Sequence, residues 1–126
     1  MPSLVQGRVI FPKIAVLDPQ GRNPKEGRPF VVITTTEDIQ NNGSIFAVGI
    51  TGMIDSSHAD RYVTLPYGPT ARSGLKKESA ALCTWLIDVL PAQVTIGTGF
   101  IDPRLVAQIA EKVAAFQIIA QVIREE

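Results

Sequence analysis

The sequence predicts one small domain built mainly from short β-strands and ended by a C-terminal α-helix. The chain has 126 residues, a length that suits one hydrophobic core, so residues 1–126 are expected to form a single domain. Hydrophobic residues make up 45% of the chain and charged residues 19%, a balance typical of globular proteins. Runs of β-branched residues alternate with segments rich in Gly, Pro and Asn, and the last segment has a helical pattern.

The first half of the chain predicts three strands. Residues 8–17 are apolar and β-branched but interrupted by Pro12, which predicts a bent strand at an edge or a bulge. Residues 18–27 are rich in turn-forming residues and predict a mobile, partly basic loop. Residues 29–36 give the strongest strand signal, and the polar stretch after them leads to another strand at 45–51. The short connection predicts an antiparallel pair, and a meander is the simplest topology.

The second half predicts two more strands and the helix. Residues 61–65 alternate as a short strand does, and residues 66–77 form a loop. Residues 79–90 combine helix-forming and strand-forming residues, and we interpret them as a strand that Pro91 ends. Asp102 followed by a proline is a typical helix start, because aspartate caps the first turn and the first helical position needs no N–H.

The final helix carries an apolar stripe that is wider than one contact with the core needs. The stripe consists of Leu105, Val106, Ile109, Ala110, Val113, Ala114, Phe116, Val122 and Ile123. Its width predicts a second packing surface on this helix.

Charge and cysteine content exclude several classes of protein. The 12 basic and 12 acidic residues cancel, so a nucleic-acid site would have to be local rather than a strongly basic surface. The single Cys83 and the lack of metal-ligand spacing exclude a disulfide framework and a structural zinc site. The sequence shows neither a charged leader with an apolar core nor an apolar run near the roughly 20 residues of a spanning helix. We therefore expect a cytoplasmic protein without a membrane partner.

Four features have both a chemical and a structural interpretation. His58 lies near two aspartates and could act in acid–base chemistry, but a solvated loop is the favoured interpretation. Cys83 lies in an apolar run and is interpreted as a small core residue. Trp85 could stack on a base, yet its apolar neighbours favour the core. Residues 97–101 resemble a glycine-rich phosphate loop but lack its third glycine and its lysine, so we reject nucleotide binding.

Arg28 is harder to explain by packing, because it places a permanently charged, forked donor at the start of the strongest strand. The structural alternative is a surface ion pair, for example with Glu26. Thr51 ends the adjacent strand, and spacing alone favours an ordinary strand residue there.

Four segments carry a pattern that extends over nearly the whole chain. They read Gly-Arg-Pro-Phe-Val-Val-Ile-Thr at 27–34, Ala-Val-Gly-Ile-Thr-Gly at 47–52, Val-Thr-Leu-Pro at 63–66 and Ser-Gly-Leu-Lys-Lys-Glu-Ser at 73–79. In this order and spacing, the sequence resembles the PemK/MazF family.

The resemblance implies an SH3-like small β-barrel of antiparallel strands with a C-terminal helix. It also implies the toxin of a type II toxin-antitoxin pair, which acts as a homodimer and is silenced by a cognate antitoxin. Such toxins are endoribonucleases that cut single-stranded RNA without a metal or other cofactor, through attack of the RNA's own 2′-hydroxyl. The family's catalytic arginine and threonine match Arg28 and Thr51, whose side chains can hold phosphate oxygens.

Basic residues near these two positions are expected to guide RNA. They are Arg22, Lys25, Lys76 and Lys77.

The sequence departs from the family pattern at two places. Some members carry an Arg-x-Asp arrangement after the Gly-Leu-Lys loop, where this chain reads Leu82-Cys83-Thr84. The loop between the first strands also lacks the Gly-Ser-Glu-like motif that is common in the family. Only Glu26 is a candidate acidic replacement there. These departures motivate an alternative, a catalytically inactive dimer that binds nucleic acid or an antitoxin-like peptide. A purely structural dimer, suggested by the apolar final helix, is a third hypothesis.

Overall fold

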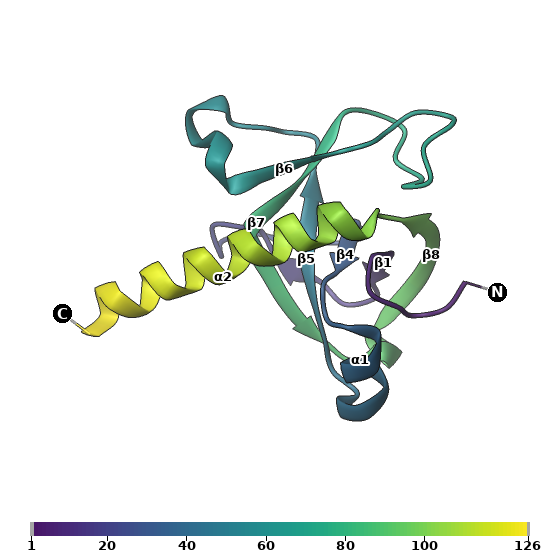
Figure 1. The fold of residues 1–126 in the computed structure, drawn as a ribbon, viewed down its shortest axis with the longest axis horizontal. Coiled ribbons are helices and arrows are strands. Elements are labelled where there is room, and N and C mark those ends of the chain that lie inside the picture. The colour runs from purple at the N-terminus through teal and green to yellow at the C-terminus, as the bar shows by residue number, and fades with distance from the viewer. Residues whose placement is uncertain (1, 126) are drawn as a thin grey trace.

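A computed structural model describes residues 2–125, with the side chains of all of these except Asn42 and residues 117–125. Most strands join one six-stranded antiparallel sheet, and a long helix crosses it (Figure 1). The elements in chain order are β1 (Arg8–Pro12), β2 (Val16–Leu17), β3 (Pro24–Lys25), β4 (Phe30–Val32), α1 (Thr36–Asn42), β5 (Ile45–Thr51), the 3₁₀ helix η1 (Ser56–Arg61), β6 (Tyr62–Leu65), β7 (Ser79–Val89), the 3₁₀ helix η2 (Pro91–Gln93), β8 (Val94–Phe100) and α2 (Pro103–Glu125).

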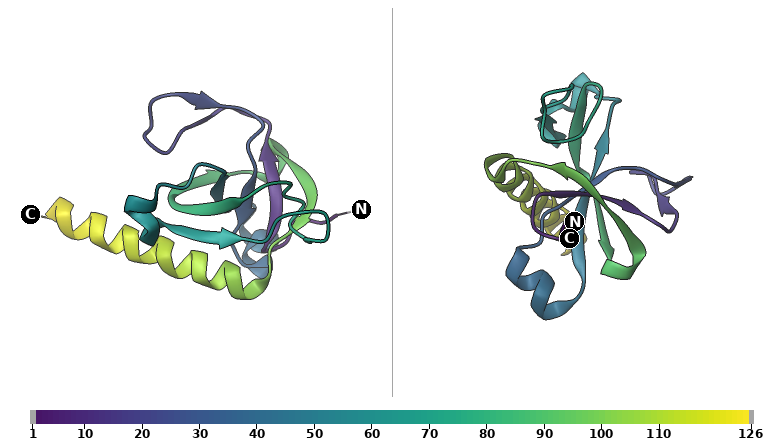
Figure 2. Two further views of the ribbon diagram at one scale, coloured as in Figure 1. Left: turned by 90° about the horizontal axis from the view of Figure 1, so that it is seen from above. Right: turned by 90° about the vertical axis from the view of Figure 1, so that its right-hand side faces the viewer.

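The sheet is covered differently on its two faces. Helix α2 lies across one face, and the hairpin of β2 and β3 extends from the other (Figure 2). Because successive side chains of a strand point to opposite faces, each face has its own buried cluster. The cluster under α2 includes Val31, Val48, Cys83, Val106 and Ile109. The cluster on the hairpin face includes Ile10, Phe30, Val32, Ala47 and Trp85.

The pairing of β7 with β5 is irregular. Val48 pairs with Leu86 and Ile50 with Ala81, so residues 82–85 of β7 lie opposite Gly49 alone. Such an excess of residues on one strand bends it and increases its twist. The first part of β7 pairs with β6 on one side and with the end of β5 on the other, whereas the second part pairs only with β5 among the described strands.

The fold class predicted from the sequence, mainly β with a C-terminal helix, is confirmed. The strand order is β6-β7-β5-β4-β1-β8, so β6 and β8 are the edges of an open sheet and, among the described residues, they do not pair with each other. The loop between β6 and β7 spans the two edges, because the Phe100 N–H of β8 donates to the Arg72 carbonyl at 2.9 Å. A carbon at Gly99 would overlap the Ser73 carbonyl, so glycine permits this close approach. The molecule is barrel-like, although hydrogen-bonded strands do not close it.

The strand expected at residues 29–36 is shorter than predicted. Only β4 is strand, and α1 begins at Thr36. Thr35 caps α1 by accepting the Asp38 N–H at 3.2 Å, and Gly43 ends it with φ of 77°. Threonine before an acidic first turn and glycine after the last turn are helix signals, and here they outweigh the strand propensity of the threonine run.

Three further predictions differ from the structure. The bent strand at 8–17 is two separate strands, β1 and β2. The 18–27 loop contains β3, which pairs with β2. The simple meander is wrong, because β7 separates β5 from β6 and the unpredicted β8 pairs with β1.

Residues 97–101, considered as a phosphate loop, mostly belong to β8. The predicted strands at 45–51, 61–65 and 79–90 are confirmed, as is the antiparallel pair of β4 and β5.

The predicted start of the final helix is confirmed. Asp102 Oδ1 accepts the Arg104 N–H at 2.8 Å, and Pro103 is the first residue of α2. Val106, Ile109 and Val113 of the stripe are buried against the sheet. Val122 and Ile123, which were also expected to belong to the stripe, are outside the set of side chains that the structure describes. No helix in the described residues is long and apolar enough to cross a membrane.

Candidate functional site

The pairing of β4 with β5 brings Arg28 and Thr51 together. Phe30 pairs with Gly49, and the Ile50 N–H donates to the Pro29 carbonyl at 3.0 Å. Extending this antiparallel register by one position places Arg28 opposite Thr51. Two residues 23 positions apart in sequence therefore lie at the same end of the strand pair.

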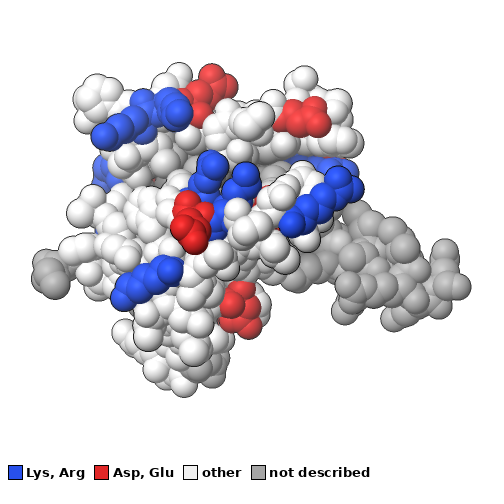
Figure 3. Space-filling model, turned by 180° about the vertical axis from the view of Figure 1, so that it is seen from behind, with Lys and Arg blue, Asp and Glu red and all other residues white. Residues whose placement is uncertain are grey.

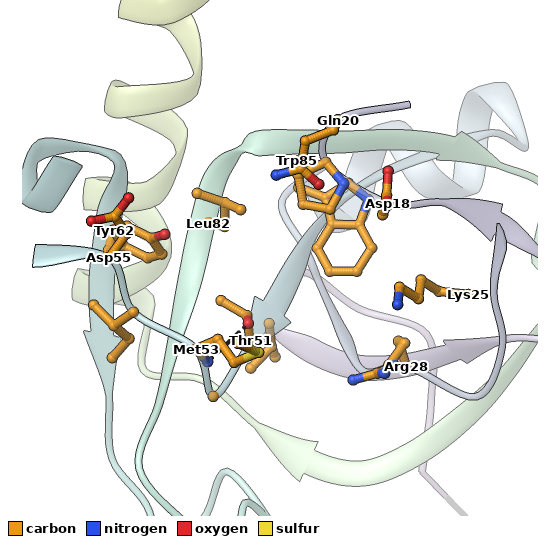
Figure 4. A pocket seen from close by; sticks show the side chains of 14 residues that line it. Asp18, Gln20, Lys25, Arg28, Thr51, Met53, Asp55, Tyr62, Leu82 and Trp85 are labelled. Carbon is orange, nitrogen blue, oxygen red and sulfur yellow. Dashed lines mark hydrogen bonds between the residues drawn. The ribbon is translucent and has the colours of Figure 1, made fainter. Parts of the chain in front are cut away.

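Both residues line a cleft of about 740 Å³, which we call the main cleft. Arg28 and Lys25 lie on one side of it, Thr51 lies between them and Asp55, and Trp85 lies beside Asp18 and Gln20 (Figure 4). The wall therefore comes from the β2–β3 hairpin, the end of β5, the segment leading to η1, and β7. The residues that line it are Asp18, Pro19, Gln20, Lys25, Arg28, Ile50, Thr51, Gly52, Met53, Ile54, Asp55, Tyr62, Leu82 and Trp85.

The Thr51 hydroxyl is held in a defined orientation. Its oxygen accepts the Met53 N–H at 3.1 Å. A hydroxyl that accepts from the backbone still has its own proton to donate. Thr51 can therefore donate to an anionic oxygen in the cleft without losing its contact with the chain.

Arg28 is exposed beside the cleft rather than locked in an ion pair. Within the part of the chain that the structure describes, no carboxylate lies within 4.0 Å of its guanidinium, so the surface ion pair with Glu26 is not formed. The five N–H groups of a guanidinium suit two oxygens of one phosphate group at a time. Arg28 and Thr51 thus both offer hydrogen-bond donors at the main cleft.

Two carboxylates of the cleft stay ionised near neutral pH. The Arg22 N–H donates to Asp18 Oδ1 at 2.9 Å and lowers the pKa of that carboxyl group. The hydroxyl and the N–H of Ser57 both donate to Asp55 Oδ1, and they lower the pKa of Asp55. Both anions offer only hydrogen-bond acceptors. They balance the basic groups nearby, and the whole face opposite α2 shows mixed charge (Figure 3).

Trp85 holds the hairpin wall of the cleft in place. Its indole Nε1 donates to the Leu17 carbonyl at 2.9 Å, which links β7 to β2. Its ring packs against Phe30 with centroids 4.8 Å apart. A side chain at Gly49 would overlap this ring, so glycine is needed there. The core interpretation of Trp85 is confirmed, since only 7% of the residue is exposed.

The remaining residues named from the sequence are distributed unevenly. Of the four expected to guide RNA, Lys25 lines the main cleft, whereas Arg22 lies near the tip of the hairpin and Lys76 and Lys77 lie in the loop before β7. Gly52 lies near Glu78, so this loop ends close to the Thr51 side of the cleft.

The two other reactive candidates follow their structural interpretations. His58 is exposed in η1, in agreement with a solvated segment. Cys83 is buried under α2, and burial raises the pKa of its thiol to about 11, so it is a core residue rather than a nucleophile.

Sequence reasoning missed Asp18, Asp55 and Tyr62 as lining residues. Each lies at the end or start of an element, and only the folding of the hairpin over β7 brings them together. Asp55 caps the start of η1 by accepting the N–H of Ser57, two positions later. An aspartate is typical of such a cap, so the local sequence indicates a helix start but not a place in the cleft.

Solved structures with a similar architecture include MazF proteins. MazF from Deinococcus radiodurans (Form-I) superposes with a TM-score of 0.65 at 17% identity, over 90% of this chain and 96% of that chain. This chain has the MazF fold. A MazE–MazF complex of the same organism gives a TM-score of 0.64 at 14% identity, over 90% and 95% of the two chains. An endoribonuclease in complex with its cognate antitoxin, from a mycobacterial species, gives 0.63 at 12% identity, over 90% and 93%.

The sequence matches no family model and no curated protein. The resemblance to the PemK/MazF family is thus supported by the MazF fold, over nearly the whole chain.

Proposed function

We propose that this protein is an endoribonuclease and the toxin of a toxin-antitoxin pair. The observation that carries the proposal is the meeting of Arg28 and Thr51 in the main cleft of a MazF fold. These two residues were selected from the sequence as the matches to the family's catalytic positions. The MazF proteins and the mycobacterial endoribonuclease named above support the same activity.

The cleft residues suit cleavage by the RNA's own 2′-hydroxyl. In this reaction the 2′-oxygen forms a bond to the adjacent phosphorus, the bond from phosphorus to the 5′-oxygen breaks, and the 2′-proton is removed while the 5′-oxygen gains one. The products carry a 2′,3′-cyclic phosphate and a 5′-hydroxyl. Negative charge builds on the phosphate oxygens, where the Arg28 guanidinium and the Thr51 hydroxyl donate. One preorganised donor of this kind is worth about 3 kcal/mol in the transition state. The protein supplies no nucleophile, and the proposal needs no metal or cofactor.

The proposed partners are single-stranded RNA, a cognate antitoxin and a second copy of this chain, in the cytoplasm. Lys25 lines the main cleft, which supports a contact with the RNA backbone there. Arg22, Lys76 and Lys77 would extend that contact outside it.

Association with a second copy is supported by an apolar groove between β5 and α2. Phe46 is 44% exposed there, and Ala110, Val113 and Ala114 of the α2 stripe line the same groove. Sedimentation at low protein concentration tests this association, and a monomer would contradict it.

Expression in cells with mapping of RNA ends tests the activity. We expect the wild-type protein to arrest growth and to create new RNA ends. The Arg28→Ala variant should do neither, whereas Arg104→Ala, which removes an exposed arginine on α2, should act as the wild type does. Equal cleavage by Arg28→Ala and wild type would refute the assignment of Arg28.

One observation favours a second candidate, RNA binding without cleavage. Leu82 and Thr84 stand where some family members carry a charged pair, and both line a cavity beside the main cleft, which therefore lacks those two charges. In this case, the purified protein would bind single-stranded RNA and leave a mixed-sequence RNA intact at every pH tested.

A further inference from the structure

A second cavity adjoins the main cleft. Its volume is about 400 Å³, within the range of small-molecule sites. It continues from the main cleft, because five residues line both: Pro19, Gln20, Asp55, Tyr62 and Leu82. His58, Arg61 and Thr84 line only the second cavity. An RNA strand whose phosphate lies at Arg28 and Thr51 would therefore bring a neighbouring nucleotide to this cavity.

Tyr62 and Leu82 form a part of the second cavity, here called its floor, on which the face of a flat ring can stack. Tyr62 of β6 pairs directly with Leu82 of β7, so an aromatic ring and an aliphatic side chain lie side by side. Leu82 is only 8% exposed, whereas Tyr62 is half-buried. Unpaired bases commonly stack on aromatic side chains in this way, with a contribution of about 1–3 kcal/mol per base.

Asp55 provides a polar edge beside this floor. Its Oδ1 accepts from the Ser57 N–H at 3.0 Å and from the Ser57 hydroxyl at 2.6 Å. Its Oδ2 forms no hydrogen bond with any described residue, so both lone pairs of that oxygen are free to accept. Because these bonds lower the pKa of Asp55, the group is an ionised acceptor near neutral pH.

We propose that the second cavity is the subsite for a base next to the cleaved phosphate, and that Asp55 selects guanine there. This inference rests on the proposed ribonuclease function. The Watson–Crick edge of guanine has two adjacent donors, N1–H and N2–H, which one carboxylate oxygen with two free lone pairs can accept. Adenine and cytosine offer one amino group beside an acceptor nitrogen, and uracil offers one N–H between two carbonyls. These three bases would place an acceptor against the carboxylate, which costs affinity.

The test maps cut sites in an RNA of randomised sequence with three proteins. The wild type should cut with guanine at one fixed position next to the bond. Asp55→Asn keeps an oxygen for the Ser57 cap but loses the anionic acceptor, so its guanine preference should fall at least about ten-fold. The matched control is Asp60→Asn, which removes the same charge from an exposed residue of η1 that lines neither cavity. It should keep the wild-type preference.

A second measurement needs no variant. Replacing the preferred guanine by inosine removes only the N2 amino group, and cleavage by the wild type should fall about ten-fold, the usual worth of one such base contact. Cleavage by Asp55→Asn should be insensitive to the replacement.

The outcomes separate this inference from the proposed function. Cleavage without guanine preference, a preference unchanged in Asp55→Asn, or indifference of the wild type to inosine would overturn the subsite and leave the ribonuclease intact. A wild-type protein that neither cuts nor binds RNA would overturn the ribonuclease and the subsite together.

Discussion

At the scale of single residues, the proposed cleavage depends on hydrogen-bond donors at the main cleft, those of Arg28 and Thr51. The sequence identified Arg28 and Thr51 through a resemblance to a family, whereas spacing alone favoured an ordinary strand residue at Thr51. The structure adds that the register of β4 and β5 leads both residues to one cleft, and that the Thr51 oxygen accepts from the Met53 N–H. Asp55 could not be predicted, because its position depends on how the segment after β5 folds over β7.

The Thr51 hydroxyl can be tested by two substitutions. Thr51→Val keeps the shape and removes the donor, so the rate of RNA cleavage should fall roughly 100-fold or more, as for loss of one transition-state donor. Thr51→Ser keeps the hydroxyl and should retain most of the rate. Single-turnover cleavage with saturating protein measures both. Equal rates for Thr51→Val and the wild type would remove Thr51 from the catalytic machinery.

Cys83 predicts a pH dependence of stability. Burial raises the pKa of its thiol from 9.0 to about 11, so the folded chain holds this proton more tightly than the unfolded chain does. The contribution of the protonated thiol to the free energy of unfolding is fully present below pH 9.0. It is lost as the pH rises toward about 11. Urea unfolding across this window should show a smaller loss for Cys83→Ala than for the wild type. Parallel losses in both proteins would contradict the assignment.

At the scale of elements, most strands could be predicted from the sequence, and the exceptions have local causes. The β8 segment contains Gly97 and Gly99, which weaken a strand signal, yet both glycines are needed because the backbone of β1 and the loop before β7 approach closely there. The helix α1 was missed because its capping residues follow a run of strand-forming residues. In both cases tertiary contacts or caps decide between competing local preferences.

The contact between β5 and β7 gives a prediction about stability. Gly49→Ala would place a methyl group into the Trp85 ring, and overpacking of this kind costs about 1–3 kcal/mol of unfolding free energy. Gly52→Ala is the control, because its new carbon would meet only the Glu78 carbonyl at an ordinary 3.5 Å. Chemical denaturation of the three proteins measures the effect. A Gly49→Ala protein as stable as Gly52→Ala would show that the Trp85 ring is not held as described.

At the scale of the whole molecule, the net charge is zero, and on the face seen in Figure 3 basic groups are interspersed with acidic ones. RNA binding should therefore depend on few contacts. The proposed phosphate contacts are those of Arg28 and Lys25 in the main cleft and of Arg22, Lys76 and Lys77 outside it. The logarithm of RNA affinity should therefore fall with the logarithm of salt concentration with a slope of about −3.5, since each phosphate contact on a single strand contributes roughly −0.7.

Substitutions of single lysines show which side chains contribute to this salt dependence. Lys25→Ala should make it shallower by about 0.7, and Lys13→Ala, which changes an exposed lysine outside the cleft, should leave it unchanged. Titrations of a short single-stranded RNA at several salt concentrations measure it. A slope of only about −1.4 would contradict the proposed contacts of Arg22, Lys76 and Lys77, since Arg28 and Lys25 alone account for that value.

The most direct test of the central claim is the chemistry of the RNA ends. The purified protein should cut a mixed-sequence RNA in the presence of a chelator, leave 2′,3′-cyclic phosphate and 5′-hydroxyl ends, and spare an RNA whose 2′-hydroxyl at the cut site is replaced by hydrogen. Arg28→Ala should abolish the reaction. Products with 5′-phosphate ends, or cleavage of the 2′-deoxy RNA, would contradict the proposal that Arg28 and Thr51 stabilise attack by the RNA's own hydroxyl.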